Sequence, residues 1–151
     1  MNEEDIKKYQ ERKKKYRQKV LEYIQKEQLV SFMNKTKWEE LRSAMYAMEI
    51  SPSYRIKYLF SADNEQDIEK IINENISYGV GVWGEEQFYN YFDIEWVKIE
   101  KLREEPQGRL IAPQILDYSQ EIRAVLEKFH IPYEEHERFF TIYGYKRVKK
   151  E

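Results

Sequence analysis

The first 51 residues contain neither glycine nor proline, and this absence constrains the fold more than any other feature of the sequence. Both residues are unfavourable inside helices, so a long stretch without them favours uninterrupted helix. Apolar side chains recur there at spacings of three, four or seven, at Ile6, Tyr9, Tyr16, Val20, Tyr23 and Ile24. This period is typical of a helix with one narrow packing face. Lys13 interrupts the face. We therefore predict a helix over residues 5–27 that docks by one seam or projects as an arm.

A second helix is predicted to begin near Thr36. Thr36 and Glu39 have the spacing of a capping box, in which each side chain binds a free backbone N–H at the helix start. An apolar face follows at helical spacing: Trp38, Leu41, Met45 and Met48. Pro52 ends this helix, because proline disfavours helical geometry in the residue before it.

Strands dominate the predicted middle of the chain. Alternation, or a high density of β-branched and aromatic residues, predicts strands over residues 54–60, 78–83, 87–92 and 94–100. A short helix that carries Ile68, Ile71, Ile72 and Ile76 is expected between the first two of these strands. A hairpin turn is expected at 84–86, and a polar loop at 101–111. An amphipathic helix follows from Asp117 or Ser119 to Phe129, with an earlier start at Pro113 as an alternative, and then a closing hairpin around 135–137.

These elements predict an α+β fold, in which a mainly antiparallel sheet is covered by two or three helices. The long basic N-terminal helix lies outside that pattern. We expect two parts, a charged helix at residues 1–30 and a single α+β domain at residues 31–151. The aromatic content of 15% is enough to form a core, and the absence of cysteine excludes disulfides and thiol catalysis. With no apolar run near ~18 residues and a polar N-terminus, we expect a cytoplasmic protein without a membrane partner.

The near-neutral total charge hides two regions of opposite sign. Residues 1–19 hold eight basic and four acidic side chains, whereas residues 61–100 hold ten acidic and two basic ones. Charge separated in this way is typical of proteins that use electrostatic attraction to find a partner.

Three motifs resemble catalytic or ligand sites, and each has a simpler explanation. Residues 79–84 (GVGVWG) match a dinucleotide-binding pattern, but a helix precedes them and an aromatic run follows, so glycines in a bent strand are expected. The acidic residues at 63–74 lack the glycine of a calcium loop, whose place Ile68 takes. His130 and His136 have no third ligand at motif spacing. We therefore expect no catalytic residue, no cofactor and no metal, and a protein that is not an enzyme.

The acidic region is the leading candidate for function, because large aromatic residues lie among its carboxylates. Exposed rings supply contact area, and negative charge attracts a basic protein partner. The residues predicted to bind that partner are Trp83, Glu85, Glu86, Tyr89, Asp93 and Glu95. A solvated acidic sheet edge is the alternative explanation of the same charges.

Nucleic-acid binding by the first helix is the alternative function. Its candidate residues are Lys13, Lys14, Lys15 and Arg17, with nearby tyrosines available to stack on bases. The acidic region elsewhere in the chain argues against it. The oligomeric state stays open, since the stripe of the first helix resembles a heptad pattern that Lys13 weakens.

Four short motifs together resemble a family of short, uncharacterised bacterial proteins, some of which are similar to immunity proteins encoded beside toxin genes. They are residues 34–41 (NKTKWEEL), 93–99 (DIEWVKI), 131–133 (IPY) and 142–145 (IYGY). The similarity covers residues 33–145 and excludes the basic helix. It implies a small bacterial cytoplasmic protein with a strand at 94–99, and it transfers no catalytic residue. An immunity protein would hold a basic toxin domain through an acidic face.

Overall fold

The computed structural model describes residues 2–59 and 83–147. The predicted helix at 68–76, the glycine motif, the acidic cluster at 63–74 and nearly all of the predicted strand at 78–83 lie outside the described residues. Every strand pair in the described part is antiparallel, which confirms the predicted α+β class.

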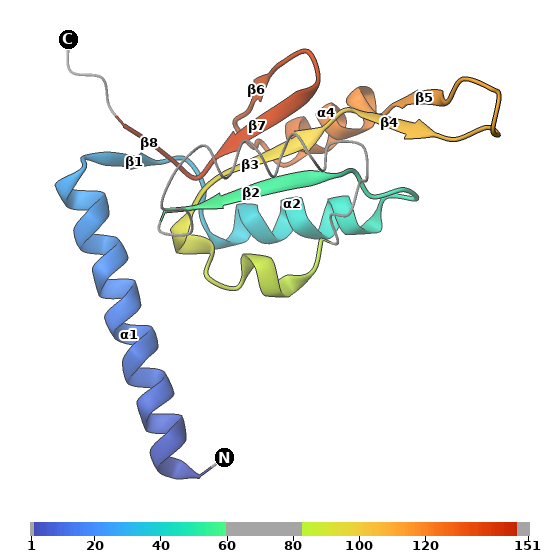
Figure 1. Cartoon of the computed structure of the whole chain (residues 1–151). Helices are drawn as coiled ribbons and strands as arrows, with labels where there is room; N and C mark the ends of the chain where they lie inside the picture. Colours follow the sequence, from blue (N-terminus) through green and yellow to red (C-terminus); the bar gives the residue numbers. More distant parts are fainter. Residues whose placement is uncertain (1, 60–82, 148–151) are drawn as a thin grey trace.

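A four-stranded sheet in the order β2-β3-β7-β6 lies at the centre of the molecule (Figure 1). Its strands are β2 (Tyr54–Tyr58), β3 (Ile94–Glu100), β7 (Phe139–Tyr143) and β6 (Glu134–Glu135). The strands β6 and β7 form the closing hairpin that the sequence predicts. Helices α2 (Lys35–Ala47) and α4 (Ser119–Lys128) pack against each other and share one buried cluster with the sheet.

The residues that form the core are those that recur on one face of each helix and strand. Helix α2 contributes Trp38, Leu41 and Met45, which lie on one helix face at spacings of three and four. The alternate residues Val97 and Ile99 of β3 point into the same cluster. The cap of α2 differs from the prediction: the Asn34 side chain, not that of Thr36, accepts the Lys37 N–H, at 2.8 Å. Asparagine satisfies the free N–H as well as threonine does, two residues earlier.

Helix α1 (Glu3–Lys26) confirms the predicted long basic helix, and Figure 1 shows it projecting from the sheet. Val20 is its one buried residue. The helix ends before Gln28, whose φ of 54° turns the chain into β1 (Leu29–Ser31). Strand β1 pairs with β8 (Tyr145–Arg147) in a separate two-stranded ribbon, so the C-terminal strand returns to the base of α1. The division of the chain at residue 30 stays a prediction.

Residues 84–92 correct the predicted strand and hairpin turn. They form two short 3₁₀ helices, η1 (Glu85–Phe88) and η2 (Tyr91–Asp93). Side chains at positions 83, 88 and 93 are buried, a spacing of five that does not fit the two-residue period of a strand. Phe88 stacks on Trp83 with ring centroids 5.8 Å apart, and this packing overrides the β-propensity of the local aromatic residues.

A second correction concerns the predicted polar loop at 101–111. Strand β4 (Leu102–Glu105) pairs with β5 (Gln114–Asp117), and the hairpin extends away from the sheet (Figure 1). Pro106 and Pro113 stand just outside the paired residues, where proline removes no ladder hydrogen bond. Residue 113 therefore precedes a strand and does not begin a helix. Helix α4 starts at Ser119, which is one of the predicted starts.

Among the described residues, none of the helices has the length and low polarity that crossing a bilayer would require.

Candidate functional site

Trp83, the central aromatic residue of the predicted docking face, is fully buried. Its ring lies 4.0 Å from that of Tyr54, centroid to centroid, and its indole N–H donates to the Pro52 carbonyl at 2.9 Å. The Trp83 ring is therefore packed inside the core, and its indole N–H has a hydrogen-bond partner there. The expectation that Trp83 lies on a binding surface is wrong for this structure.

Asp93 is also buried, beneath the contact between α1 and η2. One of its carboxyl oxygens accepts a hydrogen bond from the Tyr16 hydroxyl of α1, and the other has no partner among the described residues. Burial raises the pKa of Asp93 above its usual value, and the Tyr16 hydroxyl opposes that shift. Asp93 thus attaches α1 and is not available on the surface.

The other predicted docking residues do not form one acidic face. Glu95 is half-buried and pairs with Lys57 of β2 at 2.7 Å. Glu85 is exposed and lies 3.8 Å from Arg42, and Tyr89 is exposed and bound by Lys13. Glu86 belongs to η1, but its side chain lies outside the described part of the structure. Of the described carboxylates in the set, Asp93 is buried, Glu95 is paired with Lys57, and only Glu85 is well exposed.

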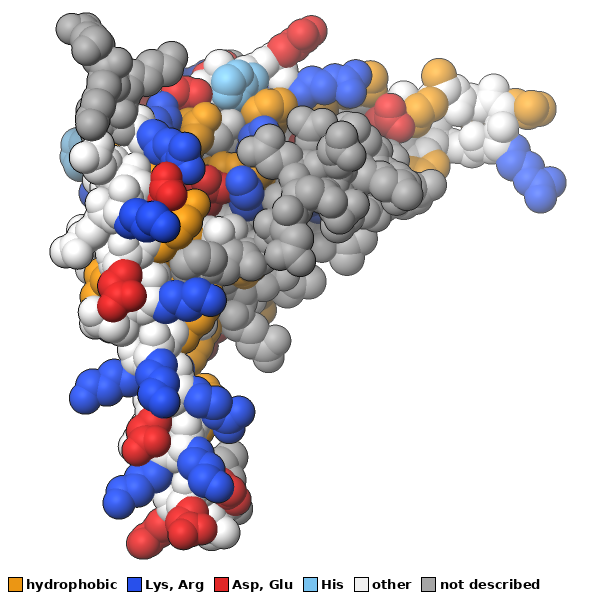
Figure 2. Space-filling model, turned by 60° about the vertical axis from the view of Figure 1, so that its left-hand side comes forward, with side chains coloured by type: hydrophobic (Ala, Val, Ile, Leu, Met, Phe, Trp, Pro, Cys, Tyr) orange, Lys and Arg blue, Asp and Glu red, His pale blue; other side chains and the backbone are white. Residues whose placement is uncertain are grey.

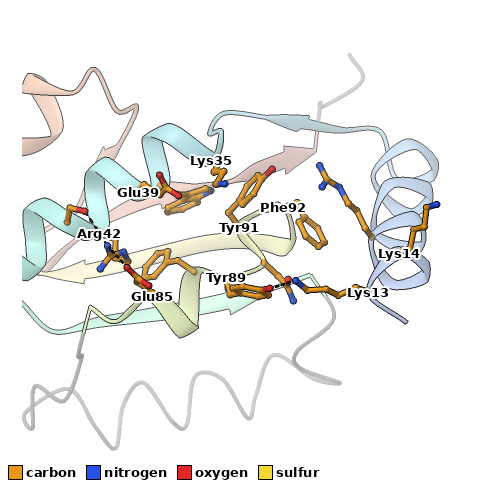
Figure 3. A pocket seen from close by; sticks show the side chains of 14 residues that line it. Lys13, Lys14, Lys35, Glu39, Arg42, Glu85, Tyr89, Tyr91 and Phe92 are labelled. Carbon is orange, nitrogen blue, oxygen red and sulfur yellow. Dashed lines mark hydrogen bonds and ion pairs between the residues drawn. The ribbon is translucent and has the colours of Figure 1, made fainter. Parts of the chain in front are cut away.

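A cleft of about 730 Å³ lies between α1 and α2, bounded by η1 and η2 (Figure 3). Its basic residues come from both helices, and two carboxylates oppose them. The lining cations are Lys13, Lys14, Arg17, Lys35 and Arg42, and the carboxylates are Glu39 and Glu85. Five aromatic rings complete the lining: Trp38, Phe88, Tyr89, Tyr91 and Phe92.

Three of the five cations also make contacts inside the cleft. Lys13 lies 3.9 Å above the Tyr89 ring and donates to its hydroxyl, which lowers the pKa of Tyr89. The Arg17 guanidinium lies 5.2 Å from the centroid of the Phe92 ring. Arg42 donates to the Trp83 carbonyl at 3.1 Å. The ammonium groups of Lys14 and Lys35 pair with no carboxylate among the described residues.

The cleft contains part of each set of residues that the sequence suggests. Lys13, Lys14 and Arg17 line it, whereas Lys15 is exposed outside the lining. Sequence reasoning missed Lys35 and Arg42, which lie seven residues apart and therefore on one face of α2. That spacing indicates that the two residues share a helix face, but it does not show that this face lies opposite α1.

The tip of the β4–β5 hairpin is the second notable surface. Leu110 is 99% exposed, Ile111 64% and Ile115 61%. Figure 2 shows the hydrophobic side chains at the distant end of the hairpin, with the basic side chains along α1 on the other side of the molecule. The two surfaces thus differ in both position and chemistry.

No group of three potential metal ligands is close enough to hold an ion within residues 2–59 and 83–147. His136 lies 3.7 Å from Glu134, which makes an ion pair when the imidazole is protonated.

Comparison of the chain with curated proteins and with solved structures finds no match. A family model matches residues 20–149, which is most of the chain and includes the whole sheet, α2, the hairpin and α4. The family is described as one of unknown function, and the match begins after the Lys13–Arg17 part of α1. The chain belongs to this family of unknown function, DUF6678.

Proposed function

We propose that this chain is a protein-binding module that holds its partner through the tip of the β4–β5 hairpin. The exposure of Leu110, Ile111 and Ile115 on one projecting ribbon carries the proposal. Each large aliphatic side chain that a partner removes from water contributes roughly 1.5–3 kcal/mol. Clustered apolar residues on a surface are typical of protein contact sites.

The shape of the hairpin defines the kind of partner. A narrow ribbon that extends from the sheet presents a convex tip, which fits a concave apolar pocket (Figure 1). Arg109 lies next to Leu110, so a carboxylate at the rim of that pocket would complement the tip. This contact replaces the acidic face expected from the sequence, because Trp83 and Asp93 are buried.

The partner we propose is a bacterial toxin, with this chain as its cytoplasmic immunity protein. The motif resemblance at residues 34–41 and 93–99 supports this finer assignment. An immunity protein acts by covering a site and needs no catalytic group of its own.

The test uses the purified product of the gene next to this one, titrated calorimetrically with the chain. Leu110→Lys should weaken binding by at least roughly tenfold, which corresponds to 1.4 kcal/mol. The matched control is Leu21→Lys, an exposed leucine on α1, which should change the affinity less than about twofold. Equal affinities of the two variants would refute the role of the hairpin. A wild-type chain that does not bind the neighbouring product would contradict the immunity assignment.

A further inference from the structure

The cleft between α1 and α2 concentrates positive charge more than the fold itself requires. Its two walls are separated in sequence, yet both present cations to the same hollow (Figure 3). Arg17 and Lys35, one from each wall, contribute to no ion pair with a described carboxylate. Like charges brought together in a hollow raise the local potential, so an anion that enters it is attracted from both sides.

The rings of the cleft add a second recognition element. Tyr89 is 59% exposed, and Tyr91 and Phe92 are half-buried at the surface of the same hollow. Behind them, Trp38 and Phe88 pack in the core with centroids 6.0 Å apart, which gives the exposed rings a firm support. Rings beside cations are the combination that binds unpaired bases and their phosphates together.

We propose that this cleft binds single-stranded nucleic acid, with phosphates at Arg17 and Lys35 and bases stacked on the rings near Tyr89. The lysine of α1 that already lies over Tyr89, Lys13, would contact the phosphate next to a stacked base. An acidic peptide would satisfy the cations but would not use the rings. A duplex would satisfy the cations but would keep its bases paired and out of reach of the rings. This binding is independent of the hairpin, which lies elsewhere on the molecule.

The charge of the cleft is tested by fluorescence anisotropy with labelled oligothymidylate and oligouridylate strands about 12 nucleotides long. Arg17→Glu should weaken binding at least roughly tenfold, because it reverses a charge that lines the cleft beside Phe92. Its control is Lys15→Glu, a neighbouring exposed lysine of the same helix that does not line the cleft. The control should change the affinity less than about threefold, through the long-range field alone. Equal losses in the two variants would show that general charge, and not the cleft, attracts the strand.

The rings are tested with a second matched pair. Tyr89→Leu should weaken binding to the strands by roughly fivefold or more, since stacking of one base contributes about 1–3 kcal/mol. Tyr46→Leu, a similarly exposed tyrosine of α2 that does not line the cleft, should leave binding unchanged. Melting curves of all variants check that each one folds.

Three further outcomes would overturn the proposal. These are absence of binding by the wild-type chain at about 50 mM salt, equal affinity for a labelled polyglutamate peptide, and equal affinity for a duplex of the same length. Leu110→Lys should bind the strands like the wild type. The failure of the hairpin proposal and the failure of the cleft proposal are therefore distinguishable.

Discussion

Helix α1 and the β4–β5 hairpin both extend from the central sheet, but they expose opposite chemistry and are attached in different ways. The outer part of α1 is covered with charged residues, whereas the tip of the hairpin is apolar. Helix α1 is held near its middle by Tyr16, which binds the buried Asp93, and at its base by Gly144, whose backbone links Phe32, the residue after β1, to Glu95 of β3. The base of the hairpin is held in part by a half-exposed ion network at Glu135. The difference teaches that a projecting element can be fixed by its base while its outer surface stays available to a partner.

The largest expected effect is at the base of α1, in Gly144→Ala. The Gly144 N–H donates to the Glu95 carbonyl at 2.8 Å, and its carbonyl accepts the Phe32 N–H at 2.9 Å. An added Cβ would lie 2.0 Å from the Ile94 carbonyl oxygen, so the backbone would have to move. We expect a loss of about 3 kcal/mol or more in the free energy of unfolding, measured by urea denaturation.

The matched control for that substitution lies at the tip of the hairpin. Gly108→Ala meets no atom closer than 3.8 Å and is strained only by its φ of +146°. We expect a loss of about 1–2 kcal/mol there. Equal losses at the two glycines would contradict the idea that the base of α1 is the more tightly constrained of the two positions.

A smaller effect is expected for Tyr16→Phe, which removes the hydrogen bond to Asp93 but keeps the ring. At pH 7 the variant should lose about 1–3 kcal/mol, because an ionised buried carboxylate loses a donor. The pKa of Asp93 is already raised by burial, so the folded state binds a proton more tightly than the unfolded state does. Its contribution to stability therefore increases as the pH falls through the folded pKa, and the cost of Tyr16→Phe should shrink over that range.

Chemical denaturation at several pH values measures this dependence, with Tyr46→Phe as the exposed control. If the stability lost in Tyr16→Phe stays constant as Asp93 becomes protonated, the hydrogen bond to Asp93 is excluded as the cause of that loss.

The smallest effect is expected at the base of the hairpin, for Glu135→Gln. Glu135 accepts two hydrogen bonds from Arg123, each of 2.8 Å, and one of 3.0 Å from Lys101. These cations lower the pKa of Glu135 from 4.5 to about 2, so its stabilising contribution is complete above pH 4.5 and is lost as the pH falls towards 2. The variant should be slightly less stable than the wild type at pH 7, and the two should converge near pH 2.

The control for this substitution is Glu137→Gln, an exposed neighbour outside the network. Thermal melting at the two pH values compares the variants. A difference between wild type and Glu135→Gln that persists near pH 2 would show that the network does not attach the hairpin.

The elements that could be predicted from the sequence are those whose apolar residues recur with a single period. The helix over residues 5–27, the apolar face of Trp38 and Leu41 and the strand at 94–99 all have such a period, and all are confirmed. Residues 84–92 could not be predicted, because their buried positions follow contacts with Tyr54 and α2 and not local geometry. The β4–β5 hairpin was missed because its exposed strands lack the alternation of a half-buried strand.

The candidate site could be predicted only in part, for a related reason. The basic residues of α1 are visible in the sequence, and Lys13, Lys14 and Arg17 do line the cleft. Lys35 and Arg42 join them only because α1 lies opposite α2, and this arrangement depends on contacts far apart in the chain. Nor does the sequence indicate which rings fill the core: Trp83 and Tyr89 are similar in context, yet one is buried and the other exposed.

The exposed β4–β5 ribbon has a consequence for aggregation. Two strands with free outer edges and apolar side chains would otherwise add to one another between molecules. Pro106 and Pro113 flank the paired residues, and Glu104 and Glu105 place negative charge on β4. Prolines and charges at these positions oppose stacking of strands from separate copies. The apolar tip can therefore stay exposed while the flanking prolines and charges oppose pairing between the edges of separate copies.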